Sequence, residues 1–358
     1  GSATATAGTA TFTGAVGSST RLDVLTVTNA AHVDGGRVDA RTQSYGALEI
    51  GAATTLSGTS VTVTGATTQA APHALTIDAD ASLAAVTVAE LTVSGAATPE
   101  RNPNPAPDQP SGGAATPPPD VTLDAGSGTV SFGSTLDGTT ADAESVTVTA
   151  STTTFSGAVG GGTRLDVLTV TNAARVDGGR IDARTQSYGS LEIGAATTLS
   201  GTSVGATGAT TQSGTHALTI AATTASLGAV AVNQLTANGS TTLNGNVTTG
   251  GAQQYVDLEL GADTTLTASS VTVTGATTQS GTRTLTIAAA TTSLGAVTVG
   301  KLTVNGTATL NGDVSTSDTQ QYANVVLGAD RQLPAAGSSD VGITGTVTRR
   351  HGLGGGGG

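Results

Sequence analysis

The sequence contains no cysteine, methionine or tryptophan, and aromatic residues make up only 2% of its 358 positions. The absence of cysteine excludes disulfide bridges and thiolate metal sites. A globular core of this size normally relies on large side chains, so any core here must be thin. One lysine and a net charge of −12 leave no cationic surface for a phosphate backbone, and no apolar run approaches the roughly 20 residues that cross a bilayer. We therefore expect neither nucleic-acid binding nor membrane insertion.

The residues that dominate the chain are threonine, alanine, valine and glycine, with 51 glycines in all. Threonine and valine are β-branched, and such side chains suit a pleated, half-buried strand better than a helical turn. Charged residues are only 11% of the chain, whereas disordered chains combine high charge with low hydrophobicity. The composition therefore predicts a folded, all-β protein.

A tandem repeat organises most of the chain. The segment 11–69 recurs almost verbatim at 154–212, and the segment 199–263 recurs at 266–330, an offset of 67 positions. A Leu-Thr-Val or Leu-Thr-Ala strand shows the phase, with spacings of 66, 77, 67 and 67 positions between its leucines. These leucines are Leu25, Leu91, Leu168, Leu235 and Leu302. The four tyrosines each lie 20 positions after such a leucine, at Tyr45, Tyr188, Tyr255 and Tyr322.

Within a repeat, short runs alternate an apolar residue with threonine, which is the periodicity of a β-strand. Pairs such as Asn-Gly, Asp-Gly and Thr-Gly separate the runs and predict turns. One repeat alone cannot bury enough apolar area to offset the ordering of its backbone, whereas stacked repeats pair their strands and share a narrow interior. The sequence thus predicts a β-solenoid, with about three rungs of roughly 22 residues in each repeat.

A proline-rich stretch lies in the one irregular interval of the repeat. Its proline and glycine content indicates extended, unpaired backbone, either a loop from one rung or a linker between two blocks, and we favour the loop. We therefore expect one solenoid block over 1–98, this insertion over 99–120, a second block over 121–345 that continues the same repeat, and a glycine-rich tail over 346–358.

Two short motifs resemble the repeat region of filamentous haemagglutinin-type exoproteins, large bacterial adhesins exported by two-partner secretion or as autotransporters. The first is a Leu-Asn-Gly-Asn/Asp-Val turn at 243–247 and 310–314, followed by Gln-Tyr. The second is a Leu-Gly-Ala-Asp segment that begins at Leu260 and Leu327, with Thr-Thr-Leu after the first copy. The resemblance implies a right-handed parallel β-helix, a secreted or cell-surface location in a bacterium, and an adhesive or scaffolding role.

The most polar part of the sequence is a group of arginines and aspartates that occurs twice, at an offset of 143 positions. We call these twelve residues the polar face: Arg21, Asp23, Asp34, Arg37, Asp39 and Arg41, then Arg164, Asp166, Asp177, Arg180, Asp182 and Arg184. Because arginines alternate with aspartates, we favour a salt-bridged, solvent-exposed surface. The alternatives are a carbohydrate-binding face or a calcium-binding face, since carboxylates are the ligands that Ca²⁺ prefers. We predict no resident cofactor.

The remaining polar residues give no signal of catalysis. His73 and His216 correspond to Arg283 in the next copy, and His32 corresponds to Arg175, which is typical of solvated loop positions. A polysaccharide-acting enzyme on a β-helix would need converging carboxylates or a basic residue beside a cleft, whereas the carboxylates here are scattered. We therefore expect the protein not to be an enzyme and assign no catalytic residue.

The favoured function is structural, as the shaft or scaffold segment of a bacterial surface adhesin. The alternative is a self-assembling subunit of an extracellular filament or sheath, because exposed rungs can pair with neighbouring molecules. A polysaccharide-acting enzyme is the less favoured third hypothesis. The partners we expect are further copies of the chain, by end-to-end or lateral association, and host or matrix glycans.

Overall fold

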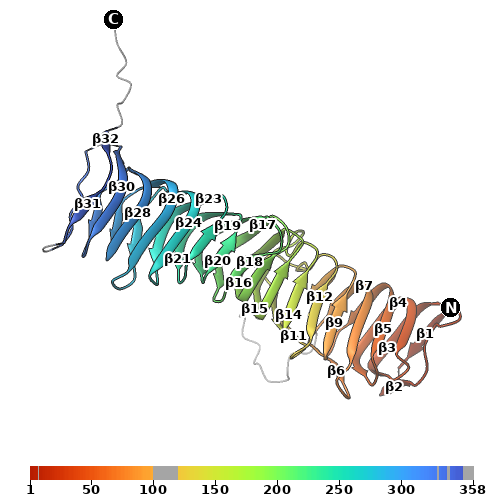
Figure 1. Ribbon diagram of the computed structural model, residues 1–358. Helices are drawn as coiled ribbons and strands as arrows, with labels where there is room; N and C mark the ends of the chain where they lie inside the picture. Colours follow the sequence, from red (N-terminus) through yellow and green to blue (C-terminus); the bar gives the residue numbers. More distant parts are fainter. Residues whose placement is uncertain (7, 100–119, 329, 337–338, 350–358) are drawn as a thin grey trace, which may run out of the picture. The chain divides into compact units, whose positions relative to one another are not determined.

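The computed structural model describes residues 1–6, 8–99, 120–328, 330–336 and 339–349 (Figure 1). These residues form strands and turns without any helix. A helix capable of crossing a membrane is accordingly not found in the described ranges. The chain divides into two compact units, Gly1–Gly201 and Thr202–Gly358, and β17 (Thr197–Ala206) contains the boundary. The predicted all-β class is confirmed.

The first unit contains sixteen complete strands, most of which end in glycine-containing turns. They are β1 (Ser2–Ala5), β2 (Thr9–Phe12), β3 (Leu22–Val33), β4 (Arg37–Ile50), β5 (Thr54–Val63), β6 (Thr67–Gln69), β7 (Ala74–Leu83), β8 (Val86–Thr87), β9 (Glu90–Val93), β10 (Ala97–Pro99), β11 (Asp120–Asp124), β12 (Thr129–Phe132), β13 (Ser145–Thr149), β14 (Thr152–Phe155), β15 (Leu165–Val176) and β16 (Arg180–Ile193).

The second unit has strands of the same kinds, in which stretches of about ten residues alternate with short stretches of three. They are β18 (Thr210–Gln212), β19 (Ala217–Leu227), β20 (Val230–Val232), β21 (Gln234–Leu243), β22 (Val247–Thr249), β23 (Ala252–Leu260), β24 (Thr264–Val273), β25 (Thr277–Gln279), β26 (Thr284–Leu294), β27 (Val297–Val299), β28 (Lys301–Leu310), β29 (Val314–Thr316), β30 (Gln320–Leu327), β31 (Val341–Ile343) and β32 (Val347–Arg349).

Each unit is a parallel β-solenoid, in which every side of a turn pairs with the same side of the next turn. In the second unit one ladder of paired residues runs through Val247, Leu266, Ile287, Val304 and Tyr322. The steps between these residues are 19, 21, 17 and 18 positions. Because parallel strands lie ~4.8 Å apart, the four steps span about 19 Å along the stack. The predicted parallel solenoid is confirmed.

The register shows that one repeat is longer than three turns. From Leu235 a ladder passes through Gln253 and Val271 to Thr292, which completes three turns in 57 positions. The other ten positions of the repeat lead along two more sides to Leu302, which belongs to a different ladder. Turns are shorter than the sequence suggested because some sides contain only three-residue strands. Each turn has three sides. The expected count of about three rungs in a repeat is thereby refined to three complete turns and two sides of a fourth.

This mismatch rotates each repeat relative to the one before it. Equivalent residues 67 positions apart fall on different sides of the turn, as Tyr255 and Tyr322 do in the second unit. The same geometry holds in the first unit, where Leu25 and Leu91 belong to different ladders. A surface feature that recurs in every repeat is therefore presented on successive sides of the solenoid.

The core is the narrow interior of the turns, where valine, leucine and isoleucine side chains point inward at every second strand position. Burial of one such side chain contributes about 1.5–3 kcal/mol, so the stability rests on many small contributions. Phe132 stacks on Phe155 of the neighbouring turn, with parallel rings and centroids 5.4 Å apart. Scarce aromatic residues are thus consistent with a bore that holds few of them.

The predicted domain boundaries can be compared with the pairing around the proline-rich insertion. β8 pairs with β11 and β9 pairs with β12, so the turn before the insertion stacks directly on the turn after it. Whether the insertion is a loop or a linker concerns 100–119, which lie outside the described residues. The boundary between the two compact units falls at Gly201, inside the block expected over 121–345.

Strand pairing continues into the beginning of the predicted tail. β32 pairs with β30, so that Leu327 lies opposite Arg349. Val347 and Thr348 still alternate an apolar residue with threonine, which explains why the strand extends past the expected boundary at 345. The remainder of the predicted tail, 350–358, lies outside the described residues.

Candidate functional site

The first copy of the polar face divides into a main group and one separate aspartate. β3 and β4 are paired strands on neighbouring turns. They bring Asp23, Arg37, Asp39 and Arg41 together with Arg21, which precedes β3. Asp39 accepts contacts from Arg21 at 3.2 Å and from Arg37 at 3.1 Å. Arg41 lies 3.5 Å from Asp23. Every carboxylate of this group is thus next to a guanidinium.

Asp34 lies apart from that group and has a different partner. Its carboxylate is 2.9 Å from Nε2 of His32, whose Nδ1 is 3.2 Å from Glu49. The second copy repeats this arrangement with arginine in place of histidine, since Arg175 contacts Asp177 at 3.0 Å and also contacts Glu192. The recurrence of Glu49 as Glu192, at the same offset as the polar face, was the signal in the sequence that could have identified these partners.

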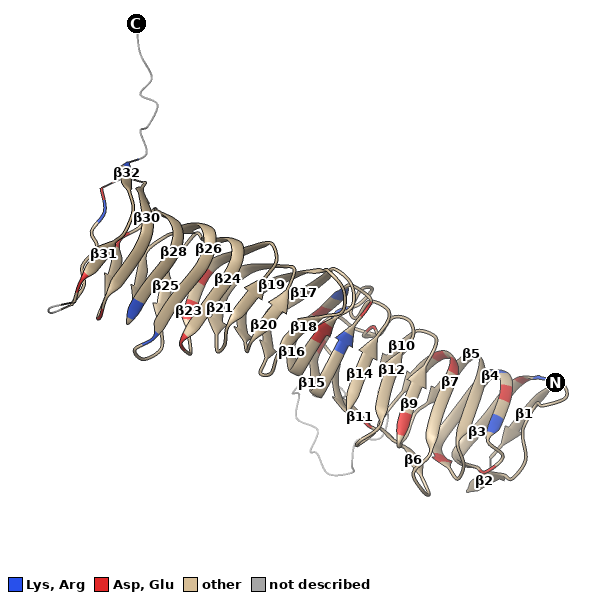
Figure 2. Cartoon of the chain, viewed as in Figure 1, with Lys and Arg blue, Asp and Glu red and all other residues tan. Residues whose placement is uncertain are grey.

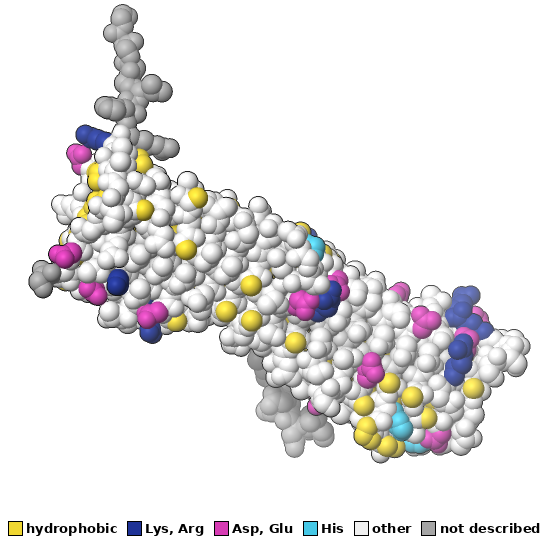
Figure 3. All heavy atoms as spheres, viewed as in Figure 1, with side chains coloured by type: hydrophobic (Ala, Val, Ile, Leu, Met, Phe, Trp, Pro, Cys, Tyr) yellow, Lys and Arg dark blue, Asp and Glu magenta, His cyan; other side chains and the backbone are white. Residues whose placement is uncertain are grey.

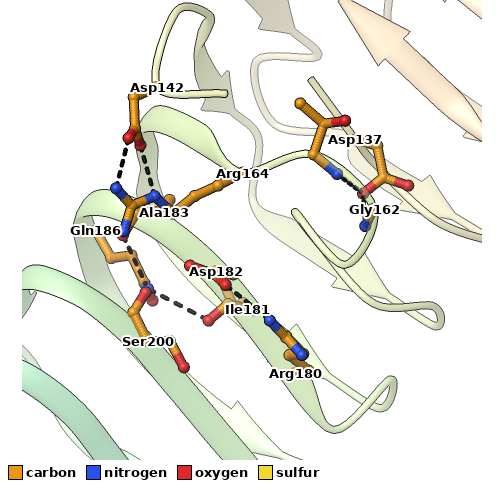
Figure 4. Close-up of polar contacts among 11 residues, drawn as sticks. Asp137, Asp142, Gly162, Arg164, Arg180, Ile181, Asp182, Ala183, Gln186 and Ser200 are labelled. Atoms are coloured by element: carbon orange, nitrogen blue, oxygen red, sulfur yellow. Dashed lines mark hydrogen bonds and ion pairs between the residues drawn. The ribbon is translucent and has the colours of Figure 1, made fainter. Parts of the chain in front are cut away.

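The main group of the second copy has one altered contact. Arg180 lies 2.8 Å from Asp182, and Arg184 contacts Asp166. Arg164, the equivalent of Arg21, instead donates from Nε and Nη2 to both carboxylate oxygens of Asp142, each at 2.5 Å (Figure 4). Asp142 has a positive φ of 59° and lies outside the segment 154–212 that recurs from 11–69, so comparison of the two copies does not address this contact.

Hydrogen bonds between guanidinium and carboxylate groups shift the pKa values of several residues in and beside the polar face. Hydrogen bonding from Arg164, with its positive charge, lowers the pKa of Asp142. Hydrogen bonds to carboxylates likewise raise the pKa of Arg164, Arg175 and Arg184. These side chains are exposed or half-exposed, so solvent screens the pairs and they contribute little to stability.

The arrangement does not assemble a metal-binding cluster. Throughout the described ranges, groups of three or more histidine, aspartate or glutamate side chains suited to a metal ion are not found. Carboxylates that calcium would require are instead occupied by arginines, as in the pairs of Arg37 with Asp39 and Arg180 with Asp182. The geometry of the polar face is therefore that of the favoured salt-bridged surface.

The charged residues occupy only small parts of the surface. Figure 2 shows basic and acidic residues next to one another on β3 and β4 and again on β15 and β16, with long uncharged stretches elsewhere. On the face shown in Figure 3, most of the visible surface is backbone together with side chains that are neither charged nor hydrophobic. Hydroxyl and amide groups therefore provide most of the chemistry that this face offers to a partner.

A second polar arrangement lies inside the solenoid and was not predicted from the sequence. Each tyrosine follows a glutamine by two positions, both side chains point inward, and both are at most 2% exposed. We call this arrangement the Gln–Tyr pair, and it occurs as Gln43 with Tyr45, Gln186 with Tyr188, Gln253 with Tyr255, and Gln320 with Tyr322. A glutamine in a strand is normally expected at the surface.

The Gln–Tyr pair forms a complete hydrogen-bond network. In the second copy the Tyr188 hydroxyl donates to Oε1 of Gln186 at 2.8 Å. Nε2 of Gln186 donates to the Ser200 carbonyl at 2.7 Å (Figure 4). The same amide is 3.4 Å from the carbonyls of Ile181 and Ala183. The glutamine therefore ties neighbouring turns together from within.

A second set of glutamines supports the connections between strands. In the second unit, Oε1 of Gln212 accepts from the backbone nitrogens of His216 at 2.8 Å and Asn233 at 2.9 Å. Gln279 does the same for Arg283 and Gly300. These carbonyls satisfy backbone donors on two successive turns, and the His/Arg position contributes its backbone rather than a catalytic side chain.

Comparison with known proteins gave no match, because no protein-family model, curated protein or solved structure corresponds to the chain.

Proposed function

We propose that this protein is a structural element, the shaft or scaffold segment of a bacterial surface or secreted adhesin. The observation that carries the proposal is the continuous parallel pairing, turn after turn, within each unit. Such a stack converts sequence length into physical length at ~4.8 Å per turn, which is what a spacer requires. The resemblance to haemagglutinin-type repeats supports the adhesive context.

The interior supports a rigid role for each stack. Apolar side chains and the Gln–Tyr pairs fill the bore, so that backbone ladders and side-chain hydrogen bonds both run along the stack. On the surface, carboxylates of the polar face are neutralised by arginines. These features stabilise the stack.

The repeat provides a direct test of the spacer role. Thr219 and Thr309 point outward from one side of the second unit, five turns apart, or about 24 Å at ~4.8 Å per turn. Deletion of residues 235–301 removes one repeat and places Leu302 against Leu218, a contact equivalent to that of Leu302 with Leu285. The expected result is a folded protein in which the axial separation of the two positions falls by about 18 Å.

Spin labels at engineered cysteines measure this separation by electron–electron distance spectroscopy, and the chain has no native cysteine to interfere. Duplication of residues 235–301 should lengthen the separation by the same amount. Loss of the fold in both variants, or an unchanged distance in the deletion variant, would contradict the spacer role.

A second candidate function is a self-assembling filament or sheath subunit. It is favoured by Val341 on β31 and Val347 on β32, which are 39% and 55% exposed. Exposed apolar residues on strands suit pairing with a further copy of the chain. Sedimentation velocity over a hundredfold range of concentration separates the candidates, because only the filament subunit should form growing assemblies that Val347→Lys abolishes.

A further inference from the structure

A depression of about 280 Å³ lies on the second unit, where three successive turns meet the solvent. β28, β30 and β31 form this part of the stack and pair in that order, as their labels in Figure 1 show. Its outer walls come from Thr303, Asn305, Gln321 and Thr344. The backbone around the buried Tyr322 forms its floor.

The depression arises where two side chains are smaller than their counterparts one repeat earlier. Gln254 pairs with Thr272, whereas its equivalent Gln321 pairs with Gly342. Val256 is likewise replaced in the next repeat by Ala323, which lines the depression. A Cβ built on Gly342 would meet its nearest neighbouring atom only at 3.9 Å, so the space beside this glycine is open. The hollow is thus a local departure from the repeat.

The walls are polar but carry no charge. Gln321 and Asn305 are exposed, and across the described part of the chain neither side-chain amide makes a hydrogen bond within the protein. Each amide offers both donors and an acceptor, and the Thr303 hydroxyl offers the same two functions. The Thr344 hydroxyl donates to the Tyr322 carbonyl at 3.5 Å and offers its oxygen as an acceptor. Lys301 and Asp340 lie two positions before Thr303 and Gly342 in the chain, and their opposite charges offset each other.

We propose that this depression binds one uncharged sugar ring of a glycan. A sugar ring presents neighbouring hydroxyls that donate and accept, which matches two free amides and two hydroxyls around a concave floor. The volume is close to the lower limit of ligand pockets, ~300 Å³, and suits a single ring rather than a chain. The excess of acidic residues in the protein disfavours sugars that carry carboxylates. This inference goes beyond the spacer role, because a passive shaft needs no ligand.

The experiment is a nuclear magnetic resonance titration of the full chain with glucose, galactose, mannose and N-acetylglucosamine, and with N-acetylneuraminic acid as the acidic comparison. We expect one or more of the neutral sugars to shift the side-chain amide signals of Gln321 and Asn305, with a Kd in the millimolar range (on the order of 1–10 mM). The acidic sugar should bind at least tenfold more weakly.

Two variants and a matched control complete the test. Ala323→Val with Gly342→Thr restores the side chains of the preceding repeat, so it should fill the hollow and weaken binding at least tenfold. Gln321→Ala should weaken binding similarly, whereas Gln254→Ala, at the filled equivalent position, should leave it unchanged. Absence of shifts with every neutral sugar, binding that survives filling, or an equal loss in Gln254→Ala would overturn the proposal. None of these outcomes alters the distance measurement that tests the spacer role.

Discussion

The Gln–Tyr pairs inside the solenoid and the polar face on its surface differ in how constant their contacts are from copy to copy. In all four copies of the Gln–Tyr pair the tyrosine hydroxyl donates to Oε1 of the glutamine at 2.7 to 3.1 Å, and Nε2 of the glutamine donates to the carbonyl 14 positions later. The polar face, by contrast, changes partners between its two copies, because Arg21 contacts Asp39 whereas Arg164 contacts Asp142. The buried arrangement is constant, and the exposed arrangement varies.

The physical reason lies in the environment of each group. A buried amide or hydroxyl without a partner costs about 1–3 kcal/mol, so every member of the internal network must be satisfied in every copy. An exposed guanidinium exchanges a carboxylate for water or for another carboxylate at little cost. The comparison therefore indicates that stacking depends on the internal glutamines and tyrosines, and that the surface charges are free to change.

The largest expected effect is a loss of stability at alkaline pH. Burial raises the pKa of Tyr45, Tyr188, Tyr255 and Tyr322 well above the ordinary value of 10.0. The unfolded chain loses these protons above pH 10 while the folded chain keeps them, so stability is complete below pH 10 and falls as the pH rises. Each tyrosine should contribute a loss of up to about 1.4 kcal/mol per pH unit.

Denaturant unfolding between pH 8 and pH 12 measures this loss, and tyrosinate absorbance reports ionisation directly. Folded protein should show no tyrosinate signal until it unfolds. Ionisation of the tyrosines near pH 10 in protein that remains folded would place them at the surface. It would contradict the contrast between a buried Gln–Tyr pair and an exposed polar face.

The next largest effect is expected from removing one internal amide. Gln186→Leu keeps the volume of the side chain but removes its hydrogen bonds with the Tyr188 hydroxyl and the Ser200 carbonyl. Loss of these two buried hydrogen bonds should cost about 2–5 kcal/mol, expressed locally around β16 and β17. Hydrogen exchange of the amides in these strands measures the change.

The matched control is the double variant Gln186→Leu with Tyr188→Phe. The second substitution removes the Tyr188 hydroxyl as well, so the double variant should regain part of the lost protection from hydrogen exchange. A single variant that exchanges as slowly as the parent protein would show that the internal network is not needed for stacking.

The smallest effect is expected on the surface. Arg164→Ala and Arg21→Ala should each lower stability by less than about 1 kcal/mol, and the difference between them should vanish in ~1 M salt. The bidentate contact makes Arg164 the more sensitive of the two. Its contribution should decline as the pH falls through the lowered pKa of Asp142.

A double-mutant cycle of Arg164→Ala with Asp142→Ala measures the coupling energy between the two side chains. A coupling above about 2 kcal/mol, beyond the range of exposed ion pairs, would contradict the contrast with the interior.

The sequence was sufficient for the fold class, because alternation of apolar residues with threonine and a regular tandem repeat both require stacked strands. The length of a turn was harder to predict, since a three-residue strand forms one side of a turn whereas a ten-residue strand spans two, and the sequence has no distinct signal for either. The Gln–Tyr pair escaped prediction because glutamine is usually a surface residue, although its recurrence two positions before each tyrosine was visible.

The surface sites show a similar division. Alternation of arginine with aspartate predicted ion pairs, and the structure places eleven of the twelve residues in one, whereas Asp34 lies beside His32. The contact of Arg164 with Asp142 depends on a turn outside the repeat and could not be deduced from spacing. The depression beside Gly342 depends on which residues lie opposite one another, which only the register reveals.

The central claim is that turns shorter than a third of the repeat stack in parallel, so that the repeat and the turn do not coincide. Engineered cysteines test it directly in a chain that has none. Thr286 and Thr303 lie opposite each other on neighbouring turns, whereas Thr309 lies opposite Ser293 on another side. Paired parallel strands lie ~4.8 Å apart, within the Cα separation of ~4.4–6.8 Å that a disulfide needs. Cysteines at 286 and 303 should therefore form a disulfide readily, and those at 286 and 309 should not; the reverse result would contradict the register on which the account depends.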